Sequence, residues 1–519
     1  MNLNDDTESL STNERRPKRK RLSSATIAGL LALSGCSQQA EQPAESAATP
    51  VSDQTSPAQP YNILMIAVDD LNNWPGAWRG MANTPNIDRL ASQGSAFKNA
   101  HAVVPACNPS RVALMTGRRP EATGQYRNPG NFRELIGNAN LETMPQFFAK
   151  QGYETVAAGK IFHKQRGKGK TPLVQSDDAS WHRQAVLDIG TGGEKEYRDE
   201  NGYGKWLEGD YNYDDKPINS YLGRFGIWGP TDIKTEETGD YSVAKYCSDY
   251  MQEKHDKPFF LACGLFRPHS AQVAPREYFD MYPLEDIETP PHPEADIQDL
   301  PEIAKYNFSS TFAKRVIATD NQWAQAVQGY KASTTFADDM IGVILDGLKG
   351  SPYEDNTIVV LWGDHGWQVG QKYRWEKFSL WHQGTNTPMI IKVPGMKAQV
   401  IEKPVSLLDI YPTIVKAANL DSVPEYLEGH DLEPLMKDPE ASWSNAAVVT
   451  YEPNNHSVRR EHWNLIQYSD GSIELYDHRN DEDEWHNLAS DPQYKGVIDE
   501  LKQWIPKESK ACEEGQCVS

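Results

Sequence analysis

Cysteine is scarce in this sequence, with six residues in a chain of 519. Six cysteines are too few for a disulfide scaffold at this length. Cys512 and Cys517 are spaced to close a small loop in an oxidising compartment. Cys247 and Cys263 are expected to be buried hydrophobic residues rather than metal ligands. The two remaining cysteines each lie in a short motif that predicts a chemical role.

The sequence also lacks a hydrophobic run long enough to cross a membrane as a stable helix, and it is short of basic residues. Lys and Arg number 52 against 73 Asp and Glu, a formal net charge of -21. This balance argues against unspecific nucleic-acid binding, which needs a basic surface. An anionic substrate would need a local basic pocket, because the net negative charge of the whole chain repels it. The hydrophobic fraction of 38% still suffices for a globular core.

The first residues have the pattern of an export signal. A basic stretch at 15–21 precedes a short apolar core at 27–33, which ends in Leu33-Ser34-Gly35-Cys36. That ending is typical of a bacterial lipobox, with Cys36 as the lipidated first residue of the mature protein. The alternative is ordinary secretion with a chance cysteine. We expect an exported bacterial lipoprotein, membrane-anchored at Cys36 and either periplasmic or on the cell surface.

Apolar runs predict strands buried on both faces of a parallel sheet. The runs span residues 61–68, 154–158, 258–266 and 357–362, and the segments 389–393 and 405–418 complete the predicted sheet and its helices. Helical spacing predicts helices at 84–91, from 109, from 143 and at 323–348. The alternation indicates an α/β fold with a large, mostly parallel sheet sandwiched by helices.

The pattern changes near residue 445, where short strands at 446–451, 462–468 and 473–477 are separated by turns. They predict a small C-terminal antiparallel-sheet subdomain. The expected parts are a signal peptide at 1–35, a flexible tether at 36–60, a catalytic domain at 61–444 and the subdomain at 445–519.

Two stretches interrupt this pattern. Residues 164–235 show weak periodicity and are expected to carry substrate-facing loops, and residues 280–305 are dense in Pro, Glu and Asp and are expected to form an irregular loop. The first begins with a basic segment at 164–170. Such a segment is either a solvated loop or a device that steers a polyanion toward the site.

Acidic pairs end two of the predicted strands. Asp69-Asp70 follows the first, and Asp364-His365-Gly366 follows the run at 357–362. Ligands of open α/β sheets bind at this edge. Carboxylates suit Ca²⁺ or Mg²⁺, whereas the imidazole alone would suggest Zn²⁺ or Mn²⁺. Taken singly, the Asp pair is better explained as helix N-caps.

Two further motifs change that interpretation. Cys107-Asn108-Pro109-Ser110-Arg111 lies in a predicted polar turn, and Gly159-Lys160-Ile161-Phe162-His163 follows a short apolar segment. With the two acidic pairs, they resemble the sulfatases of the alkaline phosphatase superfamily. The resemblance covers most of residues 61–490 and is closest to the iduronate-2-sulfatase branch.

The resemblance implies that Cys107 is oxidised to Cα-formylglycine by a formylglycine-generating or maturase enzyme. It also implies Ca²⁺ held by Asp69, Asp70, Asp364 and His365, with the modified Cys107 as a further ligand. The aldehyde would hydrate to a geminal diol, one hydroxyl of which attacks sulfur while the sugar alcohol leaves. Loss of a proton from the second hydroxyl would then expel sulfate, a covalent route that divides one difficult step into two.

Five side chains receive roles from the same resemblance. Arg111 lies one helical turn beyond Cys107 and is expected to reach the diol. Lys160 and Lys377 would hold sulfate oxygens in the transition state. His163 and His269 are the acid/base candidates, with His269 favoured for protonating the leaving sugar oxygen.

Two points in the motif region stay open. Lys372 is an alternative to Lys377 as the second lysine that holds sulfate oxygens. Lys377 is preferred for this role because Trp375-Glu376-Lys377-Phe378-Ser379 matches the family pattern. Gly363 precedes Asp364 where many sulfatases have Ser or Thr, so one hydrogen bond to the site is expected to be missing.

The resulting hypothesis is a sulfatase that cleaves sulfate monoesters from a sulfated glycan. One alternative is a phosphodiesterase or phosphonate monoester hydrolase of the same superfamily. Another is a non-catalytic glycan-binding surface lipoprotein on a decayed sulfatase fold. The sugar, the sulfated position and exo versus endo cleavage stay open.

Overall fold

The computed structural model describes residues 60–163, 177–185, 187, 228–307, 313, 316–317, 322–420 and 422–510. The predicted signal peptide, the tether, the basic segment at 164–170 and the pair Cys512 and Cys517 lie outside the described residues. Most of the expected excursion at 164–235 does so too. Within the described part, no helix has both the length and the apolar character that a membrane span requires.

An eight-stranded sheet forms the centre of the fold, in the order β13-β2-β12-β9-β1-β7-β4-β5. The strands are β1 (Asn62–Val68), β2 (Ser95–Phe97), β4 (Glu154–Gly159), β5 (Arg183–Ala185), β7 (Phe259–Leu265), β9 (Thr357–Gly363), β12 (Met389–Lys392) and β13 (Gln399–Ile401). Every pairing is parallel except the two made by β12, which runs antiparallel to β9 and β2. The predicted mostly parallel sheet is confirmed.

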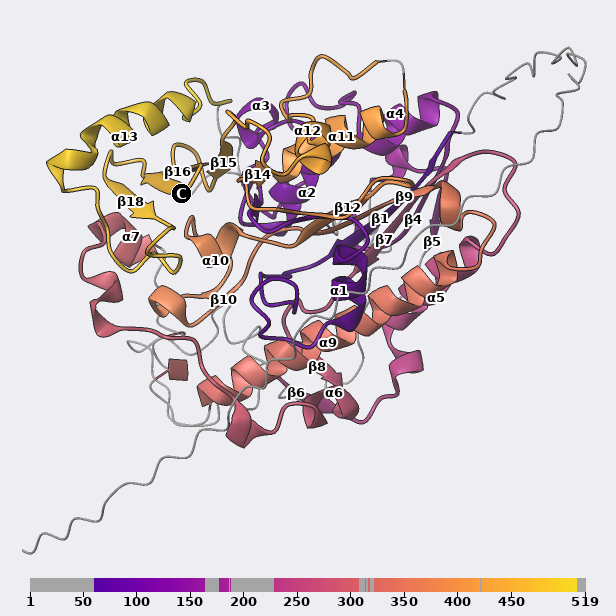
Figure 1. Ribbon diagram of the computed structural model, residues 1–519, viewed down its shortest axis with the longest axis horizontal. Coiled ribbons are helices and arrows are strands. Elements are labelled where there is room, and N and C mark those ends of the chain that lie inside the picture. The colour runs from indigo at the N-terminus through magenta and orange to yellow at the C-terminus, as the bar shows by residue number, and fades with distance from the viewer. Residues whose placement is uncertain are drawn as a thin grey trace, which may run out of the picture. The chain divides into compact units, whose positions relative to one another are not determined.

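Helices cover both faces of this sheet (Figure 1). On one face lie α2 (Cys107–Thr116), α4 (Met144–Lys150) and α11 (Ile410–Ala417); on the other lie α1 (Pro85–Ala91), α5 (Gly239–Tyr250) and α9 (Gln322–Leu348). Side chains of β1 alternate between the two cores. Ile63 and Met65 pack on the α2 side, and Leu64 and Ile66 on the α9 side. This double burial explains why the strand is a continuous apolar run.

Short elements surround the strand ends. They include β3 (Ala100–His101) with β14 (Val405–Ser406), β6 (Trp228–Thr231) with β8 (Gln272–Pro275), β10 (Gln368–Val369) with β11 (Trp375–Glu376), and the helices α3 (Pro120–Thr123), α6 (Arg276–Asp280), α10 (His382–Thr385) and α12 (Glu433–Lys437).

The stretch at 280–305 is more ordered than the sequence predicts. It holds 3₁₀ turns at Leu284–Asp286 and Glu294–Ile297 and the start of α7 (Glu302–Asn307). Leu300 and Ala304 are buried in a cluster with residues of the C-terminal subdomain. The prediction of an irregular loop was therefore wrong in part, because apolar residues spaced among the acidic ones have a surface to pack against.

Cys247 and Cys263 form a disulfide between α5 and β7. Both residues are buried, as expected, but the prediction that they are only buried hydrophobic residues was wrong. The packing of α5 on β7 brings their Cα atoms to 6.4 Å, within the range that a disulfide requires.

The C-terminal subdomain is a four-stranded antiparallel sheet of β15 (Ala447–Thr450), β16 (His456–Arg460), β17 (Trp463–Gln467) and β18 (Ile473–Asp477), with α13 (Lys495–Leu501) beside it (Figure 1). The predicted small antiparallel sheet is confirmed, although β16 was not predicted. The buried carboxylate of Glu484 accepts hydrogen bonds from Arg459 Nη2 at 3.2 Å, Asn464 Nδ2 at 2.7 Å and the backbone N–H of His382 at 2.8 Å. The subdomain is thereby joined to the chain segment that follows β11.

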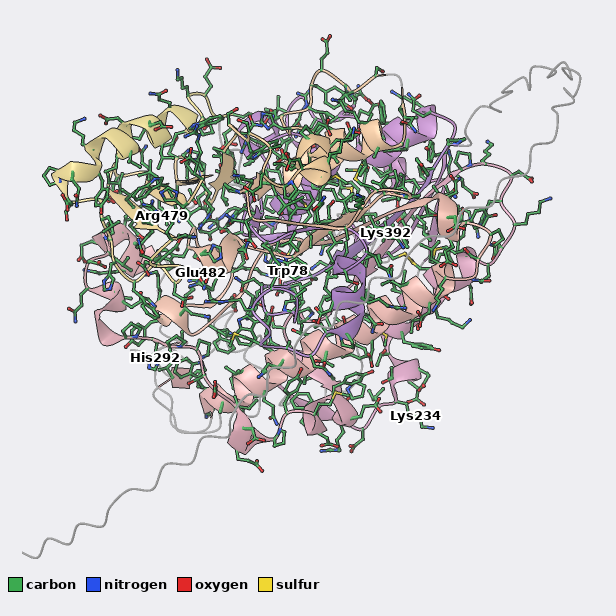
Figure 2. The ribbon with its side chains drawn as sticks, in the orientation of Figure 1. Trp78, Lys234, His292, Lys392, Arg479 and Glu482 are labelled. Carbon is green, nitrogen blue, oxygen red and sulfur yellow. A yellow bond between two sulfur atoms is a disulfide. The ribbon has the colours of Figure 1, made fainter. Side chains whose placement is uncertain are left out.

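A pocket of about 270 Å³ lies along the same junction. Trp78 and Glu482, both labelled in Figure 2, line it together with His382 and His478. An ion pair of 2.9 Å between Arg79 Nη1 and Asp483 Oδ1 further joins the two parts.

Protonation of His456 is expected to weaken the fold below pH 6.5. His456 is 2% exposed, and its Nδ1 lies 3.1 Å from Thr450 Oγ1 and 3.6 Å from Glu121 Oε1. Burial, and then the charge of Arg119, lower its pKa from 6.5 to about 4. The unfolded chain therefore binds more protons between these pH values. The stability is fully present above pH 6.5 and falls by at most about 3 kcal/mol as the pH drops toward 4.

Urea unfolding measured from pH 7.5 to 4 checks this expectation. His456→Gln should reduce the proton uptake on unfolding by about one proton in this window. The same pH slope in both proteins would show that other groups cause the acid sensitivity.

Candidate active site

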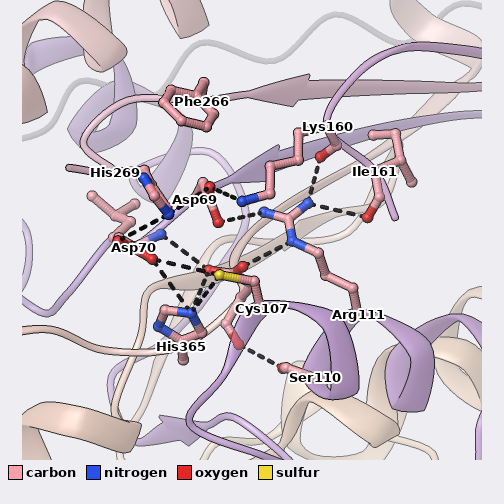
Figure 3. A network of polar contacts seen from close by, with 12 residues as sticks. Asp69, Asp70, Cys107, Ser110, Arg111, Lys160, Ile161, Phe266, His269 and His365 are labelled. Carbon is pink, nitrogen blue, oxygen red and sulfur yellow. Dashed lines mark hydrogen bonds and ion pairs between the residues drawn. The ribbon is translucent and has the colours of Figure 1, made fainter. Parts of the chain in front are cut away.

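Residues at the carboxyl ends of four adjacent strands meet at one edge of the sheet (Figure 3). Asp69 and Asp70 follow β1, Lys160 follows β4, and Asp364 and His365 follow β9. His269 comes four residues after the end of β7. Because these strands are parallel neighbours, residues up to about 300 positions apart in the chain become contact partners.

Cys107 is the first residue of α2 and is 0% exposed. Its Sγ lies 3.1 Å from Lys377 Nζ, 3.4 Å from His365 Nε2 and 3.9 Å from Asp70 Oδ1. Burial raises the pKa of the thiol, but Lys160, Lys377 and His365 outweigh burial and hold it well below its usual value. A group that carries negative charge is therefore stabilised at this position.

Arg111 lies on the same face of α2, one turn after Cys107. Its Nε donates to Asp364 Oδ2 at 2.8 Å, its Nη2 donates to Asp69 Oδ1 at 3.2 Å, and its Nη1 donates to the carbonyl oxygens of Ile161, at 3.1 Å, and Lys160. All three guanidinium nitrogens thus point toward the acids and the end of β4. Arg111 compensates the buried carboxylates at the centre of the site.

Asp70 is held by a residue for which no role is predicted from the sequence. The Tyr330 hydroxyl on α9 donates to the Asp70 carbonyl at 2.7 Å and accepts from the Asn72 N–H at 2.9 Å. Asp70 has φ +60°, and its N–H donates to Asp364 Oδ1 at 3.0 Å. Tyr330 lies within the helix predicted at 323–348. The signal that could have found it is that a buried tyrosine hydroxyl needs a hydrogen-bond partner.

Four of the predicted metal ligands form a compact donor set. Asp69, Asp70, Cys107 and His365 each offer an atom, and these atoms lie within 4.8 Å of one another. Asp70 Oδ2 is buried without a hydrogen-bond partner among the described residues. Asp364 adjoins this set, but its oxygens already accept from Arg111 and the Asp70 N–H. The two carboxylates of this set suit a divalent cation, while the thiol and the imidazole are donors that softer metals also accept.

Burial and neighbouring charges shift the pKa values of the site acids in opposite directions. Burial raises the pKa of Asp364 to about 7, although Arg111 and His365 act to lower it. Burial and Cys107 act to raise the pKa of Asp69, but Lys160, His269 and Arg111 together bring it below its usual range. Burial lowers the pKa of His365, yet Asp364 and Cys107 raise it to about 9. The pocket therefore combines buried acidic groups with the cations Arg111, Lys160 and Lys377, an arrangement typical of functional sites.

The two predicted lysines both reach this cluster. Lys160 Nζ forms an ion pair with Asp69 Oδ2, and Lys377 Nζ lies 2.6 Å from Asp70 Oδ1. The alternative, Lys372, points elsewhere: its Nζ lies 2.7 Å from Asp296 Oδ1 and also donates to the carbonyl of Glu484. The structure thus brings Lys377, and not Lys372, into the site.

The two predicted histidines both border the cluster and are both partly exposed. The His269 side chain is 13% exposed, and its Nε2 lies 4.0 Å from Asp69 Oδ2 and 3.9 Å from Asp70 Oδ2. It is thus more accessible than Lys160 and Lys377, whose side chains are 4% exposed. His163 interacts with the Cys107 thiol, and burial lowers its pKa.

Backbone and hydroxyl contacts fix the ends of the motifs. Ser110 Oγ donates to the Asp364 carbonyl at 2.6 Å. At Gly363, a Cβ would lie 2.0 Å from Thr387 Oγ1, so Ser or Thr does not fit there without a rearrangement. Thr387 Oγ1 instead donates to the Leu71 carbonyl at 2.8 Å.

Two family models match this chain. One, described as Sulfatase, matches residues 61–420. The other, described as N-sulphoglucosamine sulphohydrolase, C-terminal, matches residues 363–511. The first includes every strand of the central sheet, and the second includes the C-terminal subdomain.

Curated relatives agree with these matches. A sulfatase of Formosa agariphila is 35% identical over 460 residues, covering 86% of this chain and 86% of the relative. Iduronate 2-sulfatase of Homo sapiens is 30% identical over 368 residues, covering 66% of this chain and 61% of the relative.

Solved structures share the fold at lower identity. A structure of a 2-O GAG sulfatase has a TM-score of 0.63 and 22% identity, covering 86% of this chain and 91% of that chain. A phosphonate monoester hydrolase from Silicibacter pomeroyi has a TM-score of 0.68 and 21% identity, covering 85% and 94%.

Proposed function

Because the chain belongs to the sulfatase family, we propose that it hydrolyses sulfate monoesters of a sulfated glycan with a nucleophile derived from Cys107. The observation that carries the proposal is the setting of the Cys107 side chain. It is buried at the centre of a network in which Lys160, Lys377 and His365 stabilise negative charge. A sulfate ester brings such charge to the site, and more develops on the leaving oxygen in the transition state.

Each residue of the site has a separate role in the proposed reaction. Lys160 and Lys377 neutralise the sulfate oxygens. Their ammonium groups contact Asp69 and Asp70 beside Cys107, so they lie where the sulfate group would bind. His269, on the accessible side, donates a proton to the leaving sugar oxygen. Arg111 holds the carboxyl groups of Asp69 and Asp364 in place.

Two groups complete this proposal. Formylglycine at residue 107 supplies, as the hydrated aldehyde, a hydroxyl nucleophile where the thiol sulfur now lies. Asp69, Asp70, Asp364 and His365 would hold Ca²⁺, which polarises sulfate oxygens and eases ionisation of the nucleophile. The unpartnered Asp70 Oδ2 supports this assignment.

Rates on paired substrates test the reaction class. Sulfate release from 4-nitrophenyl sulfate and from sulfated polysaccharides should exceed hydrolysis of bis(4-nitrophenyl) phosphate. The relative named iduronate 2-sulfatase supports including iduronate 2-sulfate among the substrates, beside sulfated galactans and ulvans. Faster phosphodiester hydrolysis would favour the alternative that the phosphonate monoester hydrolase fold suggests. Glycan binding without turnover would favour the non-catalytic alternative.

We further propose that the protein is exported and lipid-anchored at Cys36. The buried disulfide between Cys247 and Cys263 supports export, since such bonds persist in oxidising compartments. Membrane fractions of the native host should contain the protein, and Cys36→Ala should move it to the soluble fraction. Equal membrane retention of the variant would contradict the anchor.

A further inference from the structure

Glu376 is a buried carboxyl group at the active site that the proposed chemistry leaves unused. It is the last residue of β11, it directly precedes Lys377, and it is 4% exposed. Its Oε1 is buried and has no hydrogen-bond partner among the described residues. A buried carboxylate oxygen without a partner lowers the stability of the fold, and such a group often has a functional role.

Glu376 is joined to the site through its neighbour in the chain, since Lys377 Nζ lies 2.6 Å from Asp70 Oδ1 and 3.1 Å from Cys107 Sγ. Burial raises the pKa of its carboxyl to about 7, and the charges of Arg374, Lys377, Asp70 and His269 also act on it. It is not part of the compact donor set of Asp69, Asp70, Cys107 and His365. Glu376 is therefore the chain neighbour of a site lysine, and it does not belong to the compact donor set.

Its backbone is strained as well. Glu376 has φ +81°, a conformation that residues with a Cβ rarely adopt, and Phe378 has φ +68°. Strain of this kind persists where the surrounding structure enforces it, often at functional sites. A hydrogen bond of 3.0 Å from Phe378 N to the Pro105 carbonyl and one of 3.0 Å from Arg374 Nε to the Lys377 carbonyl hold this segment in place.

We propose that Glu376 determines specificity by hydrogen-bonding a sugar hydroxyl next to the sulfate ester. The inference rests on the proposed sulfatase activity. Lys377 and His269 would hold the ester oxygens on either side, and Glu376 is the nearby carboxyl group still in need of a partner. A hydroxyl on the neighbouring ring carbon donates to its Oε1. An aryl sulfate, which offers no such hydroxyl, gains nothing from Glu376.

A double-mutant-type cycle, which combines one change in the substrate with one change in the protein, tests this proposal. The substrates are the sulfated disaccharide that the wild type cleaves fastest and its analogue with hydrogen in place of the neighbouring hydroxyl. For the wild type, loss of the hydroxyl should lower kcat/KM by about 10- to 100-fold, the range of one hydrogen bond to a charged group. For Glu376→Ala, both substrates should react at nearly the same reduced rate, because the two changes remove one shared interaction. Independent, additive losses would overturn the proposal.

Two further variants separate binding from folding. Glu376→Gly relieves the positive φ, so its melting temperature should hold or rise while disaccharide turnover falls relative to 4-nitrophenyl sulfate. Glu474→Gln is the matched control. Glu474 is also buried but accepts from Trp381 Nε1 and the hydroxyls of Tyr468 and Tyr476. This control should lower stability and leave the ratio of disaccharide to aryl rates unchanged.

The outcomes distinguish a failure of the proposed function from a failure of the proposed role of Glu376. A wild type that releases no sulfate from any ester would overturn the proposed function. An active wild type with equal fractional losses on both substrates in Glu376→Ala would overturn only the role of Glu376, and a lowered melting temperature in Glu376→Gly would assign it a structural role.

Discussion

Replacement of Cys107 by serine is expected to lower sulfate release by about 10⁴- to 10⁶-fold, the loss typical of removing a catalytic nucleophile. Serine has almost the same volume and keeps the buried position, so the melting temperature should change little. The serine hydroxyl can attack sulfur but has no second hydroxyl to expel sulfate. The variant should therefore accumulate a sulfated serine, which intact-protein mass spectrometry detects.

The wild-type protein provides the complementary measurement. Peptide mass spectrometry of protein from the native host should find formylglycine at position 107. Cys107→Ala serves as the control, because it should be inactive and carry no sulfate adduct. A peptide with only the thiol, from protein that is active on sulfate esters, would contradict the mechanism.

The second large effect is expected at Asp364. Asp364→Ala removes the partner of Arg111 Nε and leaves a buried guanidinium short of one of its two carboxylates. Breaking a buried pair in this way costs about 3–5 kcal/mol. The change also removes a proposed metal ligand, so activity and bound Ca²⁺ should both be lost.

Calcium titration distinguishes these two consequences. In the wild type, free Ca²⁺ at about 100-fold above its Kd should add about 2.7 kcal/mol of stability by linkage. In Asp364→Ala this increment should vanish. Asp338→Asn is a suitable control, since Asp338 is a buried acid that accepts from Ile87 N at 2.7 Å. The control should keep the calcium-dependent increment, and a normal metal content in Asp364→Ala would remove Asp364 from the ligand set.

Much of the framework could be predicted because it depends on local patterns. A continuous apolar run such as β1 signals a strand buried on both faces, and polar residues at its end signal the edge where ligands bind. The same pattern does not specify strand direction. β12 is an apolar run like the others, yet it runs antiparallel to its neighbours.

The features that were missed depend on tertiary contacts. The disulfide forms because α5 packs on β7, which the spacing of Cys247 and Cys263 does not reveal. Tyr330 reaches the Asp70 carbonyl across 260 positions of sequence. Glu376 stands next to the predicted Lys377, but only its buried, unpartnered oxygen and its positive φ single it out.

The complete burial of Cys107 has a consequence for the proposed oxidation. Cys107 begins a helix whose every residue is buried. If formylglycine forms there as proposed, the modifying enzyme would need the surrounding segment as an accessible chain, so oxidation would have to precede folding. A molecule that folded first would keep the thiol, and the active fraction of a preparation would then depend on the relative rates of modification and folding.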